Sequence, residues 1–307
     1  MILYLIACVC IAVLFGGAYY AYRIAFYAPM KDREKIPEVK GEKYEVHKSA
    51  IRDLFRELQN KPCEFVTVQS FDGLTLSGRY YHVYDGAPLA IGFHGYRSCW
   101  LTDFCGGADI AFQMGQNVLL IDERAHGKSQ GRSITFGIKE RKDLLRWIEY
   151  ARNRFGSEIK ILLYGVSMGG ATVLMASELD LPNNVRGIVA DCPYSSPLDI
   201  ILTVGKQTGY PPKLIRPFVI LGAKLFGGFD VKEITAEEAV RHSKIPILII
   251  HGADDNFVPA EMSEKIAEAN PKMIRRFTIP GADHALSYMV DTPRYRKLVM
   301  DFLAEVI

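Results

Sequence analysis

The sequence predicts an α/β fold in which a mostly parallel sheet is covered by helices on both faces, with one transmembrane helix before it. Three observations support this prediction. From residue 89 onward, short apolar runs alternate with segments of helical periodicity, which is typical of buried parallel strands joined by helices. One junction between such elements holds a glycine-bracketed serine, Ser167. The N-terminal run from Ile2 to Tyr22 contains no charged residue.

The N-terminal run is long enough to cross a membrane. At about 1.5 Å per residue, a helix over Ile2–Tyr22 covers roughly the 30 Å of a bilayer core. Tyrosines gather near its end, as in interfacial aromatic belts, and Arg23 closes it. A cleaved signal peptide is the alternative, but a charged n-region and a small-x-small cleavage site are missing. We therefore assign residues 1–27 to a single-pass transmembrane anchor.

The charges beside this anchor favour a cytoplasmic location for the rest of the chain. Arg23, Lys31, Arg33 and Lys35 follow the apolar run, and only the amino terminus precedes it. The cysteines outside the run show neither metal-ligand spacing nor a dense disulfide framework, which agrees with reduced thiols. An extracytoplasmic location stays open, because four cysteines are enough to form pairs.

Composition limits the kind of partner. The chain has 307 residues, of which 49% are hydrophobic, and a formal net charge of +2, so it can bury a substantial core. No run of lysine and arginine is long enough to line a nucleic-acid groove, and we expect no nucleic-acid partner. A small molecule is the expected ligand or substrate.

Residues 28–62 are expected to connect the anchor to a globular domain that covers residues 63–307. Prolines and glycine interrupt the first half of this connector. Its second half, Lys48–Leu58, has apolar residues at helical spacing and predicts a short amphipathic helix. We expect this helix to pack against the domain.

The globular domain opens with an antiparallel hairpin, Glu64–Ser70 and Leu74–Tyr84, around a turn at residues 71–73. Further strands are predicted near Leu89–Phe93, Asn117–Asp122, Lys160–Tyr164, Gly187–Ala190, Ile247–His251 and Arg276–Ile279. Helices are predicted near Asp103–Met114, Lys139–Phe155, Gly169–Leu179, Ala260–Ala269 and Pro293–Glu305.

A longer insertion interrupts this alternation between about residues 193 and 244. It contains several prolines and apolar helical segments such as Leu214–Phe226. Because this stretch is too long for a simple connection between two strands, it predicts a small helical cap over the carboxyl edge of the sheet. We expect the cap to shape the substrate pocket.

Ser167 has the setting of a catalytic nucleophile. A strand leads into the turn between Gly165 and Gly169, and a helix leads out, so the turn lifts the serine hydroxyl above the sheet. The backbone N–H of Met168 is then free to face a developing oxyanion. A serine hydroxyl also needs a base to take its proton and an acid to orient that base.

Two later loops supply candidates for the base and the acid. Asp254 and Asp255 follow the strand at Ile247–His251, and His284 follows the last strand. The order of Ser167, then a carboxylate, then His284 is the order expected for a nucleophile, acid and base in this sheet topology.

These motifs resemble the α/β-hydrolase superfamily, in particular esterase-like members with a short helical cap. The similarity covers the chain from about Glu64 to its C-terminus and includes His94-Gly95-Tyr96 after the first parallel strand. It implies that the N–H groups of Tyr96 and Met168 form the oxyanion hole. It also implies that His94 stabilises its own loop.

The resemblance also assigns the acid. The family pattern His-Gly-x-x-Asp-x-x-Val-Pro aligns with the segment from His251 to Pro259 and identifies Asp255. Asp191, at the end of the preceding strand, is the alternative position used by a few relatives. One departure from the family is Ala125, which stands where a loop glycine is usual, and it affects the loop backbone without touching the triad.

The sequence therefore predicts a membrane-anchored serine hydrolase that cleaves carboxylic esters, with Ser167, Asp255 and His284 as its triad. We expect no metal and no cofactor, and a small ester or lipid-like molecule as substrate. A thioesterase or acyltransferase, a lysophospholipase and a peptidase use the same triad, so they stay open. A non-catalytic ligand-binding protein on the same fold is the alternative from another class. The natural substrate and the oligomeric state are left open.

Overall fold

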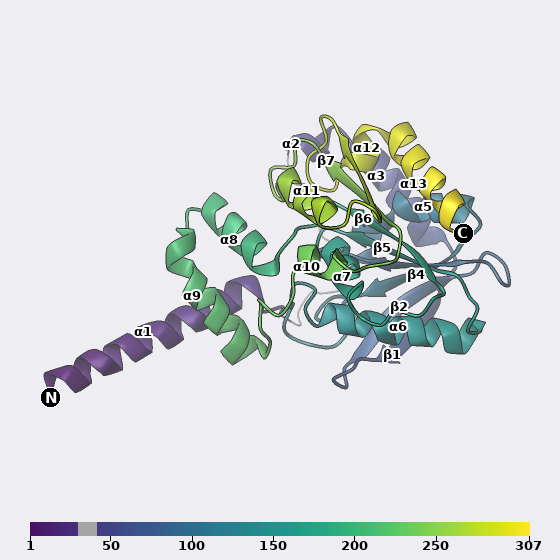
Figure 1. Cartoon of the computed structure of the whole chain (residues 1–307). Coiled ribbons are helices and arrows are strands. Elements are labelled where there is room, and N and C mark those ends of the chain that lie inside the picture. The colour runs from purple at the N-terminus through teal and green to yellow at the C-terminus, as the bar shows by residue number, and fades with distance from the viewer. Residues whose placement is uncertain (30–41) are drawn as a thin grey trace.

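The computed structural model describes residues 1–29 and 42–307 and confirms the predicted fold class (Figure 1). Eight strands form one sheet in the order β1-β2-β4-β3-β5-β6-β7-β8. β2 pairs antiparallel with β1 and β4, whereas the pairs from β4 to β8 are parallel. The strands are β1 (Glu64–Gln69), β2 (Thr75–Tyr81), β3 (Leu89–Phe93), β4 (Asn117–Asp122), β5 (Ile161–Val166), β6 (Val185–Asp191), β7 (Ile247–Gly252) and β8 (Ile274–Ile279). Each lies on a segment predicted as a strand.

Helices cover both faces of the sheet, because successive side chains of a buried strand point to opposite faces and both faces are apolar. In β3, Leu89, Ile91 and Phe93 belong to one hydrophobic cluster and Ala90 to the other. The first cluster includes residues of α6 (Glu140–Phe155), α7 (Met168–Ala176), α10 (Ala236–Val240) and α11 (Ala260–Ala269). The second includes residues of α3 (Lys48–Asn60), α4 (Trp100–Phe104), α5 (Gly107–Gln113) and α13 (Thr292–Val306).

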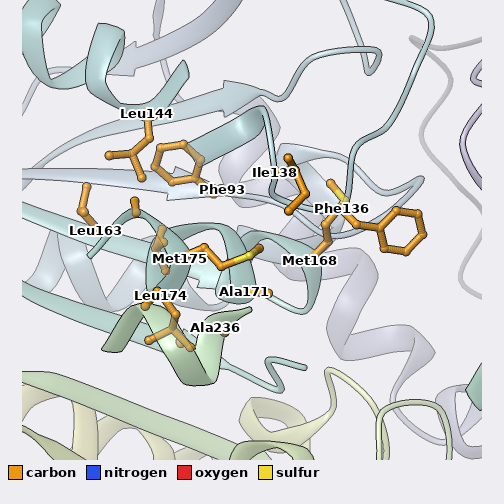
Figure 2. Packing of buried hydrophobic residues seen from close by; sticks show 14 of the residues in the cluster. Phe93, Phe136, Ile138, Leu144, Leu163, Met168, Ala171, Leu174, Met175 and Ala236 are labelled. Atoms are coloured by element: carbon orange, nitrogen blue, oxygen red, sulfur yellow. The ribbon is translucent and has the colours of Figure 1, made fainter. Parts of the chain in front are cut away.

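The helix α7 is the most enclosed of these elements, and all nine of its residues are buried. Figure 2 shows the side chains of Met168, Leu174 and Met175 packed near Phe93, Leu144, Leu163 and Ala236, which come from the sheet, α6 and α10. A helix that is packed on all sides has a fixed position. It therefore holds the residue before it, Ser167, in place.

The helix predicted at Asp103–Met114 is divided in two, α4 and α5. The break falls at Gly106, where an added Cβ would lie 2.5 Å from the ring of Tyr288. This close approach requires glycine, and two adjacent glycines weaken a continuous helix. Periodicity alone did not reveal the break, because Tyr288 is distant in the sequence.

The N-terminal helix α1 (Ile2–Ala25) extends away from the sheet (Figure 1). Its stretch Tyr4–Ala25 is long and apolar enough to cross a membrane, and only 6% of its most apolar window is buried. The C-terminal end of α1, in contrast, is partly buried in the domain. The ring of Phe26 is fully buried and packs edge-on against Phe136 and Phe229, at centroid distances of 5.8 and 5.2 Å. The last turn of α1 thus contributes to the domain core.

Phe26→Ala is therefore expected to lower the free energy of unfolding by about 3–5 kcal/mol, the usual cost of removing a buried aromatic ring. Chemical denaturation of the full chain in detergent, followed by circular dichroism, measures this change. Phe15→Ala is the matched control, because Phe15 lies on the same helix and is 55% exposed. Equal stability of the two variants would show that Phe26 does not support the core.

The predicted cap consists of α8 (Pro197–Gln207), α9 (Pro212–Gly222), a π-helical turn η1 (Ala223–Gly227) and α10. The end of α8 stays near the carboxyl edge of the sheet, where the Gln207 side chain donates to the backbone carbonyl of Asn256 at 2.7 Å. In contrast, α9 and η1 lie alongside α1 (Figure 1). The insertion is helical as predicted, but this part of it packs against the N-terminal helix.

Candidate active site

Ser167 lies in the tight turn between β5 and α7, in the conformation of a nucleophile elbow. Its backbone has φ 55° and ψ −112°, a strained conformation for a residue with a side chain. An added Cβ on Gly165 would lie 2.2 Å from the carbonyl oxygen of Gly169. One on Gly169 would lie 1.8 Å from the carbonyl oxygen of Phe93. Both glycines are therefore required for the close packing of this turn, as the sequence predicts.

The structure brings the three predicted triad side chains together. The Nε2 atom of His284 lies 3.0 Å from Oγ of Ser167, and its Nδ1 atom lies 2.7 Å from Oδ2 of Asp255. A carboxylate can only accept, so Nδ1 carries the imidazole proton and Nε2 is free to accept the serine proton. This is the geometry of a nucleophile, base and acid in series.

Asp255 is held as an anion. Its Oδ1 accepts the backbone N–H groups of Phe257 and Val258 at 2.9 and 2.7 Å. Burial alone would raise the pKa of Asp255, but hydrogen bonds with His251 and His284 outweigh burial and hold the pKa below its usual value. Asp254, the neighbouring candidate, is exposed.

Asp191, the alternative acid, has a different partner. It is buried, and its carboxylate interacts with the side chain of Tyr295. Burial raises the pKa of Asp191 to about 6, against the smaller lowering effects of Tyr295 and the nearby histidines. It is Asp255 whose carboxylate contacts the imidazole of His284.

The two predicted oxyanion donors belong to segments that adjoin the serine. Met168 directly follows it, and the loop that holds Tyr96 approaches so closely that an added Cβ on Gly95 would lie 3.4 Å from Cβ of Ser167. Within the described residues, neither the Met168 nor the Tyr96 amide donates a hydrogen bond. Both donors are thus available to a bound molecule.

A set of side chains fixes the loop from His94 to Ser98. Asp103 accepts from the Gly95 amide and from the Ser98 hydroxyl, each at 2.6 Å. The Nε2 atom of His94 accepts a hydrogen bond from the Glu123 amide at 3.1 Å. His94 thus stabilises its own loop, as the resemblance implies. Asp103 was not singled out from the sequence, because no local pattern connects it with a glycine eight residues earlier.

The loop after β4 supports the same region. His126 accepts a hydrogen bond from the Arg97 amide through Nε2, at 3.0 Å. Ala125, which replaces a usual glycine, has φ 64°, a conformation that favours glycine. Alanine thus adopts the glycine-like backbone here, and the loop keeps its contact with Arg97.

A cavity of about 310 Å³ extends from Ser167 and His284 into the domain. It lies between the sheet and α4 and α5, and its walls are largely apolar; they include Gly92, Phe104, Ala108, Ala111, Leu120 and Val189. The volume is at the lower end of the range for small-molecule pockets. One end of the cavity therefore holds the serine, and the rest can take an apolar group.

Two described residues of the connector contribute to the wall of this cavity. Tyr44, in the short helix α2 (Glu42–Glu45), and Ile51 of α3 line it, and the described lining includes no residue between 193 and 244. The hydroxyl of Tyr44 donates to the backbone carbonyl of His284 at 2.6 Å. The expectation that the cap shapes the pocket is wrong for this cavity, because α9 and η1 pack against α1 instead.

One group of possible metal ligands lies within the site. A ligand atom from each of Cys192, Asp255 and His284 falls within 4.8 Å of the others. The carboxylate and the imidazole already bind each other, and burial raises the pKa of the Cys192 thiol well above its ordinary value. A protonated thiol is a poor metal ligand. The group fits a hydrogen-bonded triad better than a metal site.

Comparisons with known proteins agree with this architecture. A sequence profile described as the alpha/beta hydrolase fold matches residues 91–244. The uncharacterised protein YqkD of Bacillus subtilis is 26% identical over 253 residues, which are 82% of each chain. The uncharacterised membrane protein YNL320W of Saccharomyces cerevisiae is 26% identical over 63% of this chain and 62% of its own.

A solved structure gives the same result at the level of the fold. The esterase Pf2001 of Pyrococcus furiosus superimposes with a TM-score of 0.67, covering 88% of this chain and 97% of its own. The two sequences are 24% identical. The similarity establishes that the two chains share their fold.

Proposed function

The chain belongs to the family of proteins with the alpha/beta hydrolase fold, and from this premise we propose that it is a serine hydrolase that cleaves carboxylic esters. The observation that carries the proposal is the continuous hydrogen-bonded series from Asp255 through His284 to Ser167, with spacings of 2.7 and 3.0 Å. The series ends beside an apolar cavity. A serine activated in this way attacks acyl carbonyl groups.

The reaction follows from the positions of the side chains. His284 takes the proton of the Ser167 hydroxyl while Oγ forms a bond to the ester carbonyl carbon. The amides of Tyr96 and Met168 donate to the resulting oxyanion. The intermediate then expels the alcohol, which takes the proton from His284. Water, deprotonated by the same imidazole, attacks the acyl-enzyme and releases the acid with regeneration of the serine.

The cavity favours a substrate with an apolar acyl group of modest size. Its walls are largely apolar, and burial of each methylene of an acyl chain contributes about 0.8 kcal/mol. Thioesters present the same acyl carbonyl, so a thioesterase is the alternative that the cavity also fits. A peptidase is less favoured, because the largely apolar walls offer fewer partners for the amide groups of a peptide than for an acyl chain.

We also propose that α1 anchors the enzyme in a membrane as a single span, with the catalytic domain on the cytoplasmic side. The length and composition of Tyr4–Ala25 support the span, and the basic residues after it support the orientation. A C-terminal alkaline phosphatase fusion in a bacterial host is expected to be inactive, since that enzyme needs an oxidising compartment. High phosphatase activity would place the domain on the other side.

The full chain in detergent or in lipid nanodiscs is the right material for testing the activity, because Phe26 belongs to the core and a truncation would remove it. We expect hydrolysis of p-nitrophenyl esters from acetyl to lauroyl, with the rate falling once the acyl group exceeds the cavity. A fluorophosphonate probe should label the protein and block this activity. Mass spectrometry of the labelled peptide should place the probe on Ser167.

Two outcomes would count against the proposal. Labelling of a different serine would refute Ser167 as the nucleophile. Binding of ester ligands without turnover, across both esters and thioesters, would favour a non-catalytic ligand-binding protein. A higher rate with matched thioesters than with oxygen esters would instead identify a thioesterase.

A further inference from the structure

The helices α9 and η1 present a surface that the proposed catalysis does not use. We define the α9 surface by its exposed apolar residues Tyr210, Leu214, Leu225 and Phe226 and its exposed cations Lys213, Arg216 and Lys224. We propose that this surface docks on a lipid bilayer and binds anionic lipid headgroups, beside the membrane span of α1. The proposal relies on the anchoring of α1 but not on the chemistry at Ser167.

The first argument is the close packing of α9 on α1. An added Cβ on Gly222 would lie 2.5 Å from the backbone carbonyl of Ala18, so the two helices cross at small residues. An added Cβ on Gly17 would lie 2.5 Å from the ring of Phe218. Small residues at a crossing are typical of helices that pack within a membrane. The two helices therefore form one unit.

Aromatic contacts extend this unit toward the end of α1. The ring of Phe226 lies 5.2 Å from that of Tyr19 and 6.0 Å from that of Tyr22, measured between centroids. The hydroxyl groups of Tyr20 and Tyr210 lie 3.3 Å apart. Tyrosine rings of this kind are frequent at the level of lipid headgroups.

The contact between Gly17 and Phe218 also fixes where α9 lies along α1. Gly17 is eight residues before Ala25, the last residue of the candidate span. At about 1.5 Å per residue, Phe218 lies about 12 Å inside that end of the span. If α1 crosses a bilayer, the part of α9 that packs on Gly17 lies beside the segment of α1 that enters the lipid.

The second argument is the set of exposed apolar residues on α9 and η1. Leu214 of α9 and Leu225 of η1 are 62% and 50% exposed, and Pro217 between them is also exposed. Exposed leucines are costly in water and favourable in the acyl region of a lipid leaflet. The cavity at Ser167 gives no alternative use for these residues, because no residue of α9 is among the cavity-lining residues.

The third argument is charge. From Ile200 to Phe229 the chain contains four lysine or arginine residues and no aspartate or glutamate. Lys213, Arg216 and Lys224 are exposed, and none of them forms an ion pair within the described residues. A set of exposed apolar residues flanked only by cations matches the chemistry of an anionic lipid surface.

The test uses tryptophan fluorescence of the full chain in nanodiscs. Leu214→Trp and Leu225→Trp report from the α9 surface, and both sites are exposed, so the substitutions leave the core intact. Tyr84→Trp is the matched control, because Tyr84 is 51% exposed in the loop after β2. Phosphatidylcholine brominated on its acyl chains should quench the new tryptophan at positions 214 and 225 but not at 84.

The preference of the α9 surface for anionic headgroups is tested in the Leu225→Trp variant. Energy transfer from the tryptophan to dansyl-phosphatidylglycerol should exceed transfer to dansyl-phosphatidylcholine at the same mole fraction. Changing Lys213, Arg216 and Lys224 to glutamine should abolish this excess, since each cation near an anionic surface enriches it about fivefold. Circular dichroism checks that each variant is folded.

Three results would overturn the proposal. Equal, low quenching at positions 214, 225 and 84 would show that α9 does not reach the lipid. Low quenching together with two chains per disc would assign the surface to a second copy of the chain. Equal transfer to both dansyl lipids would exclude the preference for anionic headgroups. None of these readouts depends on ester turnover, so failure of the proposed catalysis is separately visible.

Discussion

Ser167→Ala is expected to lower kcat for ester hydrolysis by a factor on the order of 10⁶, the loss seen when a triad serine is removed. Without Oγ, no acyl-enzyme can form, and only the oxyanion donors and the binding cavity are left to assist water. The fold should be retained, because the methyl group of alanine replaces only the hydroxymethyl group and the Ser167 amide still donates to the Asp191 carbonyl.

Ester turnover and circular dichroism of the same preparation measure this prediction. Ser157→Ala is the matched control, because Ser157 is exposed in the loop before β5 and should leave turnover and fluorophosphonate labelling unchanged. A Ser167→Ala protein that keeps more than a trace of activity would mean that another residue is the nucleophile.

Asp255→Asn is expected to lower kcat by about 10⁴-fold with little change in KM. The amide oxygen of asparagine can still accept from Phe257 and Val258, so the loop should keep its shape. Its NH₂ group would face Nδ1 of His284, which would then become an acceptor. The proton would move to Nε2, and the imidazole could no longer take the serine proton.

Two further variants make this prediction specific. Asp254→Asn changes the exposed neighbour and should leave kcat unchanged. Asp191→Asn removes the alternative acid, and we expect a much smaller loss than for Asp255→Asn, since Asp191 is paired with Tyr295. If Asp191→Asn caused the larger loss, the assignment of the acid would be reversed.

Much of the fold was accessible from the sequence because its signals are local. Most strands of the parallel sheet are short apolar runs, and each glycine of the elbow lies two residues from Ser167. The order of Ser167, Asp255 and His284 follows from the topology, since loops after successive parallel strands meet at one edge of the sheet. The structure adds the distances that place these three side chains in contact.

The walls of the cavity were not accessible, because they depend on contacts between distant segments. Tyr44 is 240 residues before His284, whose carbonyl it contacts, and nothing in its surroundings marks it. The same holds for α9, whose length and prolines suggested a cap. α9 packs against α1 because Gly222 allows a close approach to the backbone of Ala18. The sequence pattern within either segment does not reveal this contact.

The burial of Phe26 links the completion of the core to the N-terminal helix α1. The N-terminal helix leaves the ribosome first, but its last turn is enclosed by Phe136 and Phe229, which are synthesised much later. The Phe26 carbonyl likewise accepts from the Ile134 amide at 2.8 Å. With α1 inserted in a membrane, as we propose, the nascent domain would complete its core at the membrane surface, around a helix end already held there.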